Sequence, residues 1–189
     1  MKWLLVAMLL CLVPSVLAQS QEIEEHSMGT GEVELIEYSD FQCPFCARFF
    51  TDTLPQIKAN YIETGKVKFV YKHFPLDSIH PQATPAALAA ECAKEQGKFW
   101  EYHNALFANQ ALLGDSNYKK WASDLGLDTE QFNDCYDTQK YLTQVRNDLQ
   151  EGSSAGIRGT PGFLVNGQII SGAQPFVAFQ QAIEAALAG

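Results

Sequence analysis

Residues 32–46 read EVELIEYSDFQCPFC and carry the strongest structural signal in the chain. Over 32–38, polar and apolar side chains alternate and β-branched residues are present, which predicts a strand buried towards its end. A short connection follows, and then come two cysteines separated by two residues. Pro44 suits the first position of a helix, because its missing N–H would have no helical partner there. The stretch therefore predicts a strand, a short connection and a helix from Pro44, with Cys43 at the N-terminus of the helix.

The segment Cys43-Pro44-Phe45-Cys46 has the spacing that thiol–disulfide exchange requires. Unpaired N–H groups and the helix dipole stabilise a thiolate at a helix N-terminus, so the pKa of Cys43 should fall below that of free cysteine. Cys46 lies on the same helical face, within bridging distance. We therefore expect Cys43 to be an exposed nucleophile and Cys46 to be the resolving thiol behind it.

Two other interpretations of this motif remain open. Two cysteines at this spacing can supply half of a zinc site, but zinc needs two further ligands. The sequence offers no second pair of this kind, and His73 and His80 are isolated. We therefore expect neither a metal site nor a cofactor. The cysteines can also form a purely structural disulfide, although so short a loop gains little from chain entropy.

The rest of the chain predicts an α/β protein. Strands are expected at 32–38, 67–74, 162–165 and 168–171. Helices are expected at 44–64, 83–96, 99–108, 118–125, 129–136, 139–150 and 175–187. The first two strands should lie parallel, because a helix connects them. Pro55 should kink the first helix, and Asn166-Gly167 predicts a tight hairpin turn.

The N-terminus has the pattern of a secretory signal peptide. Residues 1–18 read MKWLLVAMLLCLVPSVLA, which combines one basic residue, a short apolar run and small residues before a cleavage site. An uncleaved anchor is the alternative. Residues 19–30 are polar and lack periodicity, so we expect a flexible leader. The chain is therefore expected to be exported and to work in the periplasm or outside the cell.

Charge and cysteine content narrow the class of protein. The formal net charge is −9, with 13 Lys and Arg against 22 Asp and Glu. Nucleic acid is not an expected partner, because phosphate binding needs clustered basic residues. Cleavage of the signal would leave four of five cysteines, an even number that suits an oxidising compartment. Spacing favours a Cys92–Cys135 bridge worth up to ~4 kcal/mol, and two buried free thiols are the alternative.

Three stretches resemble the DsbA-like branch of the thioredoxin superfamily. They are residues 38–46, residues 92–107 and Gly159-Thr160-Pro161-Gly162-Phe163. The resemblance covers roughly 31–187 and implies a thioredoxin fold, β-α-β followed by β-β-α. The fold would occupy 31–80 and 156–189, with an inserted all-helical subdomain at 81–155. This arrangement agrees with the order of elements that the periodicity predicts.

The resemblance also implies roles for three residues. The Thr160–Pro161 bond would be cis and face the redox pair, with the Thr160 backbone free to pair with an extended substrate. An ordinary trans turn is the alternative. Glu37 would be a buried acid that assists proton transfer at Cys46. The alternative for Glu37 is that strand alternation places it in solvent.

Aromatic residues near the motif are candidates for substrate binding. Phe41, Phe45 and Phe163 are expected to form an apolar rim for unfolded polypeptide, whereas Phe49 is expected in the core. The strongest oxidants of the family often have His where this chain has Phe45. A neutral ring offers the thiolate no charge-assisted hydrogen bond, so we expect a reduction potential below theirs.

These features predict an exported thiol–disulfide oxidoreductase that donates its Cys43–Cys46 disulfide to client proteins. The implied partners are unfolded or reduced clients and a membrane quinone-linked thiol oxidase that restores the disulfide. A monomer is favoured, because the leader is too short for the dimerisation domain of isomerases of this superfamily. The alternatives are a reductase or isomerase of the same fold, and a redox-inert chaperone that binds polypeptide.

Overall fold

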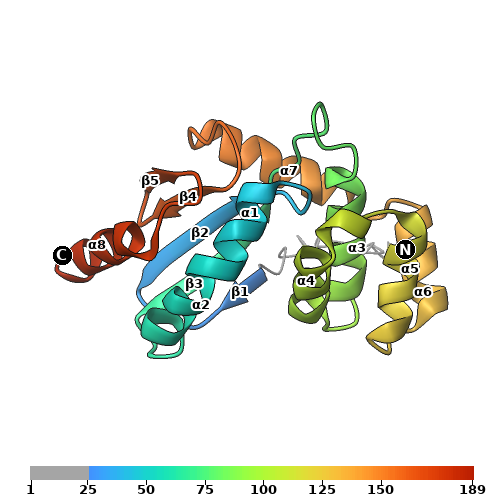
Figure 1. The fold of residues 1–189 in the computed structure, drawn as a ribbon, viewed down its shortest axis with the longest axis horizontal. Helices are drawn as coiled ribbons and strands as arrows, with labels where there is room; N and C mark the ends of the chain where they lie inside the picture. The colour runs from blue at the N-terminus through green and yellow to red at the C-terminus, as the bar shows by residue number, and fades with distance from the viewer. Residues whose placement is uncertain (1–25) are drawn as a thin grey trace, which may run out of the picture.

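The computed structural model describes residues 26–189, so the predicted signal peptide and most of the predicted leader lie outside the described residues. One five-stranded sheet forms the centre of the molecule, with the strand order β1-β3-β2-β4-β5 (Figure 1). The strands are β1 (His26–Met28), β2 (Val33–Ser39), β3 (Val67–His73), β4 (Gly162–Val165) and β5 (Gln168–Ser171).

Helical segments connect and cover these strands. Between β2 and β3 lie α1 (Pro44–Arg48), η1 (Phe49–Thr53), α2 (Leu54–Ile57) and η2 (Lys58–Ile62). Between β3 and β4 lie α3 (Ala83–Lys94), α4 (Phe99–Ala108), η3 (Gln110–Leu112), α5 (Asp115–Asp124), α6 (Thr129–Asp137) and α7 (Leu142–Ser154). The chain ends in α8 (Phe176–Leu187).

The helix expected over 44–64 is continuous in direction but changes its winding around Pro55. Wide π turns at Phe49–Thr53 and Lys58–Ile62 flank a short α-helical segment that contains the proline. Proline has no N–H to donate, and its ring crowds the preceding turn. Where the sequence predicts a kink at Pro55, the structure thus shows a local widening of the helix on either side of α2.

Two of the strand pairings, β2 with β3 and β4 with β5, follow the sequence prediction. β2 and β3 are parallel, with Glu37 opposite Tyr71. β4 lies antiparallel to β2 on its other side, with Phe163 opposite Glu37. Asn166 and Gly167 both have positive φ, 43° and 85°, as a tight turn between β4 and β5 requires. Glu37 therefore occupies the central strand, between two buried aromatic residues.

The sheet is covered on both faces. Leu35 belongs to the main core, which the helices between β2 and β3 share, whereas Tyr38 packs in a second cluster that includes Leu149 of α7. A Cβ on Gly152 would lie 2.6 Å from the Tyr38 ring, so this glycine allows α7 to approach the sheet closely. Within the segment predicted as an insert, α7 thus packs on the sheet itself.

The expectation of a flexible leader up to residue 30 is wrong for its last part. His26–Met28 form β1, which pairs antiparallel with β3 at the edge of the sheet. Three residues are too few to show a period of two, and the strand forms because the β3 edge supplies its hydrogen-bond partners. The pairing of His26 with Tyr71, which lies 45 positions later in the sequence, thus determines this strand.

Helices α3 to α6 pack together beside the sheet (Figure 1). A disulfide joins Cys92 of α3 to Cys135 of α6, with an S–S distance of 1.99 Å and a Cα–Cα distance of 5.8 Å. This is the pairing that the spacing of the cysteines favours, and it excludes two free thiols in this structure. Within residues 26–189, no helix is long and apolar enough to cross a membrane.

Candidate active site

Cys43 is the N-cap residue of α1, with an extended backbone, and Pro44 is the first helical residue, as the sequence predicts. The Cys43 thiol donates a hydrogen bond to the backbone oxygen of Thr160 at 3.4 Å. Cys43 and Cys46 are both free thiols. Only 3% of Cys43 is exposed, so the expectation of an openly exposed nucleophile is wrong, because neighbouring segments cover its side chain.

The pKa of Cys43 is lowered to about 6. The main cause is a hydrogen bond from the Cys46 thiol, and burial opposes it by raising the pKa. The Thr160 side chain and the backbone N–H groups of Phe45 and Cys46 add smaller stabilisation of the thiolate. The pKa of Cys43 is lowered, as the sequence predicts, but the hydrogen bond from the Cys46 thiol lowers it more than the N–H groups at the helix N-terminus do.

Cys46 shows the opposite behaviour. It is completely buried, and burial raises the pKa of its thiol well above the ordinary value. The hydrogen bond to Cys43 and the charges of Glu37 and Cys43 raise the pKa further. Cys43 therefore ionises at a much lower pH than Cys46, which is the order expected of a nucleophile and a resolving thiol.

Glu37 is buried, with 1% of its surface exposed. Strand alternation places Glu37 on the same face of β2 as Leu35, towards α1. Because helices cover both faces of the sheet, the Glu37 side chain on this face is shielded from solvent. Burial is the main cause that raises the pKa of Glu37 to about 8. The carboxyl group therefore keeps its proton at neutral pH, near the thiol of Cys46.

The Thr160–Pro161 peptide bond is cis, as the resemblance implied, and an ordinary trans turn is excluded in this structure. The bond directly precedes β4, whose register with β2 brings this corner next to the start of α1. The Thr160 backbone oxygen consequently contacts the Cys43 thiol rather than a strand. A residue 117 positions from Cys43 thus contributes directly to its environment.

The loop between β2 and α1 is held by a carboxylate. Asp40 accepts a hydrogen bond from the backbone N–H of Gln42 at 2.8 Å through Oδ1. Its other oxygen accepts from the backbone N–H of Leu76 at 3.0 Å and lies 2.7 Å from Nδ1 of His80. Asp40 therefore ties the loop that precedes Cys43 to the segment that follows β3.

Gln110 is a positioning residue that sequence reasoning missed. Its side-chain Nε2 donates to the backbone oxygens of Phe41, at 2.8 Å, and Cys43, at 2.9 Å. Gln110 begins the short turn η3 in the helical part of the chain. A polar residue in an irregular turn carries no local signal of such a contact, because its partners lie 67 and 69 positions away.

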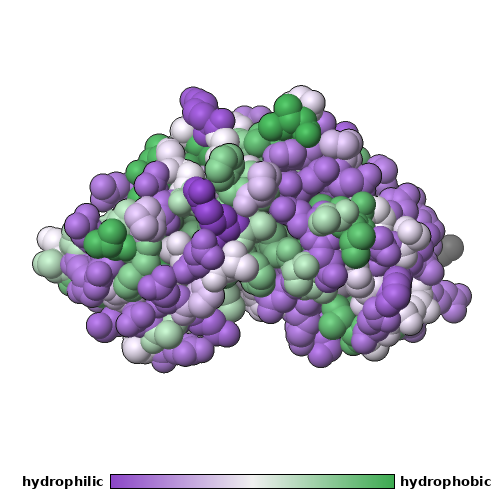
Figure 2. All heavy atoms as spheres, viewed as in Figure 1, coloured by the Kyte–Doolittle hydropathy of each residue, from purple (hydrophilic) through white to green (hydrophobic). Residues whose placement is uncertain are grey.

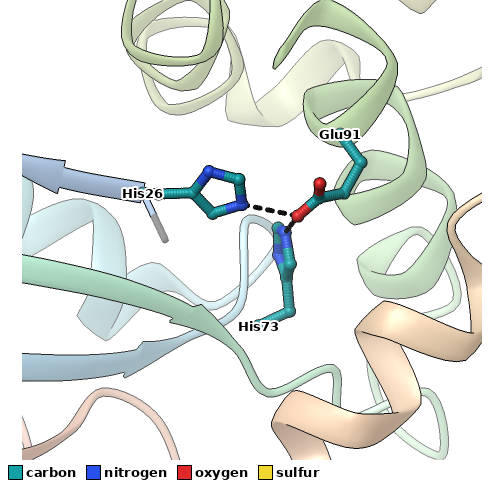
Figure 3. Close-up of side chains that lie close together, drawn as sticks. All are labelled: His26, His73 and Glu91. Atoms are coloured by element: carbon teal, nitrogen blue, oxygen red, sulfur yellow. Dashed lines mark hydrogen bonds and ion pairs between the residues drawn. The ribbon is translucent and has the colours of Figure 1, made fainter. Parts of the chain in front are cut away.

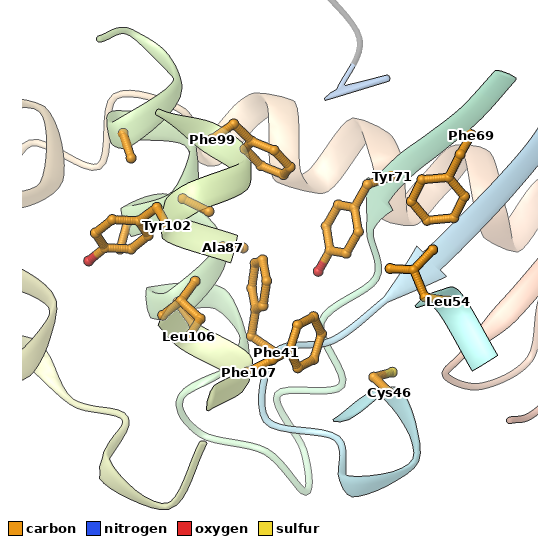
Figure 4. Packing of buried hydrophobic residues seen from close by; sticks show 14 of the residues in the cluster. Phe41, Cys46, Leu54, Phe69, Tyr71, Ala87, Phe99, Tyr102, Leu106 and Phe107 are labelled. Carbon is orange, nitrogen blue, oxygen red and sulfur yellow. The ribbon is translucent and has the colours of Figure 1, made fainter. Parts of the chain in front are cut away.

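Two residues of the predicted apolar rim are in the core, so that prediction is wrong for them. Phe41 is 1% exposed and packs against Phe107, at a ring-centre distance of 5.0 Å (Figure 4). Phe163 is completely buried and lies 4.5 Å from the ring centre of Phe49. Their large apolar side chains are covered because the helices α4 and α8 bring further aromatic rings against them.

Phe45 remains exposed, and two further exposed apolar side chains belong to segments that bind the loop before Cys43. Phe45 is 53% exposed, Ile79 68% and Leu112 57%. Ile79 lies in the segment that binds Asp40, and Leu112 belongs to the same short turn as Gln110. Figure 2 shows hydrophobic surface at the upper edge of the molecule, near the loop that joins β3 to α3. Only the tertiary structure shows that the segments carrying Ile79 and Leu112 bind the loop before Cys43.

The histidines that the sequence left isolated both have partners. His80 pairs with Asp40 near the redox loop. His73 lies 2.9 Å from Glu91, which also contacts His26. The expectation that His73 and His80 stand apart from other ligand-type residues is therefore wrong, because β3 and α3 meet in the folded chain.

Comparison with known proteins agrees with this geometry. A family model described as Thioredoxin matches residues 20–185. The Na(+)/H(+) antiporter NhaA 3 of Salinispora tropica is 33% identical over 166 residues, covering 87% of this chain and 25% of that protein. The chain thus spans about a quarter of the length of this curated relative.

Solved structures are similar over most of the chain. The crystal structure of oxidised BdbD from Bacillus subtilis matches with a TM-score of 0.78 and 26% identity, covering 87% of this chain and 94% of BdbD. The crystal structure of α-DsbA1 from Wolbachia pipientis matches with a TM-score of 0.74 and 24% identity, covering 86% and 90%. The second likeness supports the fold alone.

Proposed function

Because the chain belongs to the thioredoxin family, in its DsbA-like branch of thiol–disulfide oxidoreductases, we propose that it is an extracytoplasmic dithiol oxidase for client proteins. The observation that carries this proposal is the asymmetry of the Cys43 and Cys46 pair. The pKa of Cys43 is about 6, whereas the pKa of Cys46 is raised well above its ordinary value. Such a pair has one thiol suited to exchange with a partner and one suited to resolve the product.

The proposed reaction begins with the Cys43–Cys46 disulfide. A client thiolate attacks the Cys43 sulfur, a client–Cys43 disulfide forms, and the Cys43–Cys46 bond breaks. Cys46 leaves as a thiolate and takes the proton of Glu37, whose pKa of about 8 keeps it protonated at neutral pH. A second client thiolate then attacks the client sulfur and releases Cys43 as a thiolate. The client dithiol is oxidised by two electrons, and the Cys43 and Cys46 pair is reduced.

The stability of the reduced pair supports the proposed direction of electron flow. Interactions that lower the pKa of Cys43 stabilise its thiolate, which exists only after reduction. Stabilising the reduced form raises the reduction potential and favours oxidation of clients. Phe45 adds no charge-assisted hydrogen bond, so we place the potential between those of thioredoxin, about −270 mV, and DsbA, about −120 mV.

Client binding would use the surface around Cys43. The backbone of Thr160 lies beside the Cys43 thiol and would pair with an extended segment of the client. Phe45, Ile79 and Leu112 are exposed apolar side chains on segments that follow or bind the loop before Cys43, and they would contact the client's apolar residues. Unfolded polypeptide offers both an extended backbone and exposed apolar side chains.

The proposal also covers the partner that reoxidises the protein, its oligomeric state and its location. A membrane quinone-linked thiol oxidase would reoxidise the pair after each cycle. The chain would act as a monomer, outside the cytoplasm, where disulfides persist. The Cys92–Cys135 disulfide supports this location.

The test is oxidation of a reduced client that contains two cysteines, followed by mass spectrometry. The disulfide form should oxidise the client stoichiometrically. Cys46→Ser, incubated instead with the client in its disulfide form, should accumulate a mixed disulfide at Cys43, because the Cys43 thiolate breaks the client disulfide and no second thiol resolves the product. Cys43→Ser should remove the activity and leave no adduct at Cys46. A chain that prevents client aggregation equally well after Cys43→Ser, without oxidising it, would instead be a chaperone. Faster rearrangement of scrambled disulfides than oxidation of reduced ones would indicate an isomerase.

A further inference from the structure

Three buried side chains form a second cluster outside the redox site (Figure 3). Nε2 of His26 lies 2.5 Å from Oε1 of Glu91, and Nε2 of His73 lies 2.9 Å from the same oxygen. One ligand-type atom from each residue lies within 4.8 Å of the others. The residues come from β1, the end of β3 and α3, so the cluster forms only when these three elements meet.

The surroundings of this cluster are enclosed and largely apolar. His26 is 7% exposed, His73 1% and Glu91 0%. The ring of Phe99 stacks on His26 with a ring-centre distance of 3.6 Å, and Tyr71 contacts the edge of His73 at 5.4 Å. These rings fix the orientation of the imidazoles and keep water away. A charged carboxylate in such a place needs strong compensation.

Hydrogen bonds between the three residues leave part of the carboxylate unused. Within residues 26–189, the second oxygen of Glu91, Oε2, is buried and has no hydrogen-bond partner, while both histidines converge on Oε1. Leaving a buried carboxylate oxygen unpaired is costly, and such groups call for an explanation. A cation between the three side chains would use both oxygens at once.

We propose that His26, His73 and Glu91 bind a divalent transition-metal ion of the zinc class. The two Nε2 atoms and the two carboxylate oxygens supply four donor atoms, the number that Zn²⁺ takes in structural sites. Two imidazoles favour zinc and its neighbours over Ca²⁺ or Mg²⁺, which prefer oxygen ligands throughout. The site has no thiolate and is distinct from Cys43 and Cys46. Local sequence patterns did not predict this site, because its ligands show no regular spacing along the chain.

Such an ion would have a structural role. It would connect the short edge strand β1 to the centre of the sheet and to the helix that carries Cys92. Because the ligands meet only in the folded chain, ion binding favours the folded over the unfolded state. The proposal is independent of the proposed oxidase activity.

The first experiment is equilibrium dialysis of the chain against zinc chloride, with Cys43 and Cys46 held as a disulfide so that neither thiol binds zinc. Metal analysis should find one zinc per chain, and zinc should raise the melting temperature. No retained zinc would overturn the proposal and leave the cluster as a hydrogen-bonded triad.

A matched pair of variants locates the ion. Glu91→Gln preserves the size of the side chain but removes its charge and should weaken zinc binding at least about tenfold. His80→Gln removes another histidine that lies beside a carboxylate, Asp40, and should leave the zinc affinity unchanged. Unchanged zinc affinity in a folded Glu91→Gln variant would overturn the proposal.

A measurement on the unaltered chain decides the matter if Glu91→Gln does not fold. In ¹⁵N spectra of the imidazoles, zinc should shift the Nε2 resonances of His26 and His73 and leave those of His80 and His103 in place. Retention of zinc without a shift at His26 and His73 would overturn the proposed site.

Discussion

Both cysteine pairs of the folded chain can form disulfides, but one pair forms a bridge between helices and the other consists of free thiols. Cys92 and Cys135 form a bridge between two helices, 43 positions apart, and neither thiol is available for exchange. Cys43 and Cys46 lie within one turn of a helix and are free. The bridge constrains a long loop of the unfolded chain, whereas the short motif constrains little. Loop length and electrostatic surroundings, rather than residue type, separate structural from reactive cysteines.

Removing the bridge should have the largest effect on stability. The double variant Cys92→Ala, Cys135→Ala should lower the free energy of unfolding by ~4 kcal/mol, since the unfolded chain regains its loop entropy. Thermal unfolding should show a melting temperature lower by about 8–16 °C. Client oxidation at 25 °C should persist, because the bridge lies outside the redox pair. An equal loss of stability in Cys43→Ser would contradict the distinction between the pairs.

Alkylation of the reduced protein should separate the two thiols of the redox pair. With a pKa of about 6, Cys43 should react with iodoacetamide at half its maximal rate near pH 6. At pH 7 its thiolate fraction should be about 30-fold that of an ordinary thiol. Peptide mass spectrometry after short labelling should find the adduct on Cys43, and the remaining Cys46 of Cys43→Ser should label slowly.

The same pKa gives a stability prediction with a definite sign. Folding lowers the pKa of Cys43 from 9.0 to about 6, so its contribution to stability is fully present above pH 9 and is lost as the pH falls through 6. Denaturant titration of the reduced proteins should show that the free energy of unfolding of the wild type rises relative to that of Cys43→Ser as the pH rises from 6 to 9. A constant difference across this range would refute the lowered pKa.

Replacing the buried acid should affect the redox pair more moderately. Glu37→Gln should slow client oxidation at pH 7 about tenfold to hundredfold, because Cys46 loses its proton donor. The difference should shrink as the pH rises through about 8, where wild-type Glu37 ionises. Because folding raises this pKa, the contribution of Glu37 to stability is present below pH 4.5 and is lost as the pH rises through 8.

Glu34→Gln is the matched control, since Glu34 lies on the same strand but is partly exposed and pairs with Lys68. Stopped-flow measurements of client oxidation should give the same rate for Glu34→Gln and wild type. If Glu34→Gln slowed client oxidation as much as Glu37→Gln does, the substitutions would be acting through the structure of β2 rather than through the proton of Glu37.

The smallest expected change concerns Phe45. Phe45→His should raise the reduction potential by about 30 mV, a tenfold change in the exchange equilibrium, since a protonated imidazole adds a charge-assisted hydrogen bond to the thiolate. Redox titration against glutathione measures the shift. Phe45→Leu keeps an apolar side chain and should leave the potential unchanged, and an equal rise in both variants would exclude the charge as the cause.

Local patterns predicted the parts of the redox site that depend on neighbours in sequence. The Cys43-Pro44 sequence predicted the helix start, because proline restricts the backbone and needs no donor at that position. Asn166-Gly167 predicted its turn, because both residues tolerate positive φ. The position of Phe41 was not predictable in this way, since its burial depends on Phe107, which another helix supplies.

The amino-acid sequence alone was sufficient for the order of the strands and helices that follow β1, the reactive pair and the helical segment between the second and third predicted strands. These features follow from periodicity and backbone preferences, which act over a few residues. The tertiary structure was needed for the proton on Glu37, the contact of Gln110 with the redox loop and the meeting of His26, His73 and Glu91. Each of these depends on burial or on contacts between residues more than about 15 positions apart, and packing of the whole chain produces both.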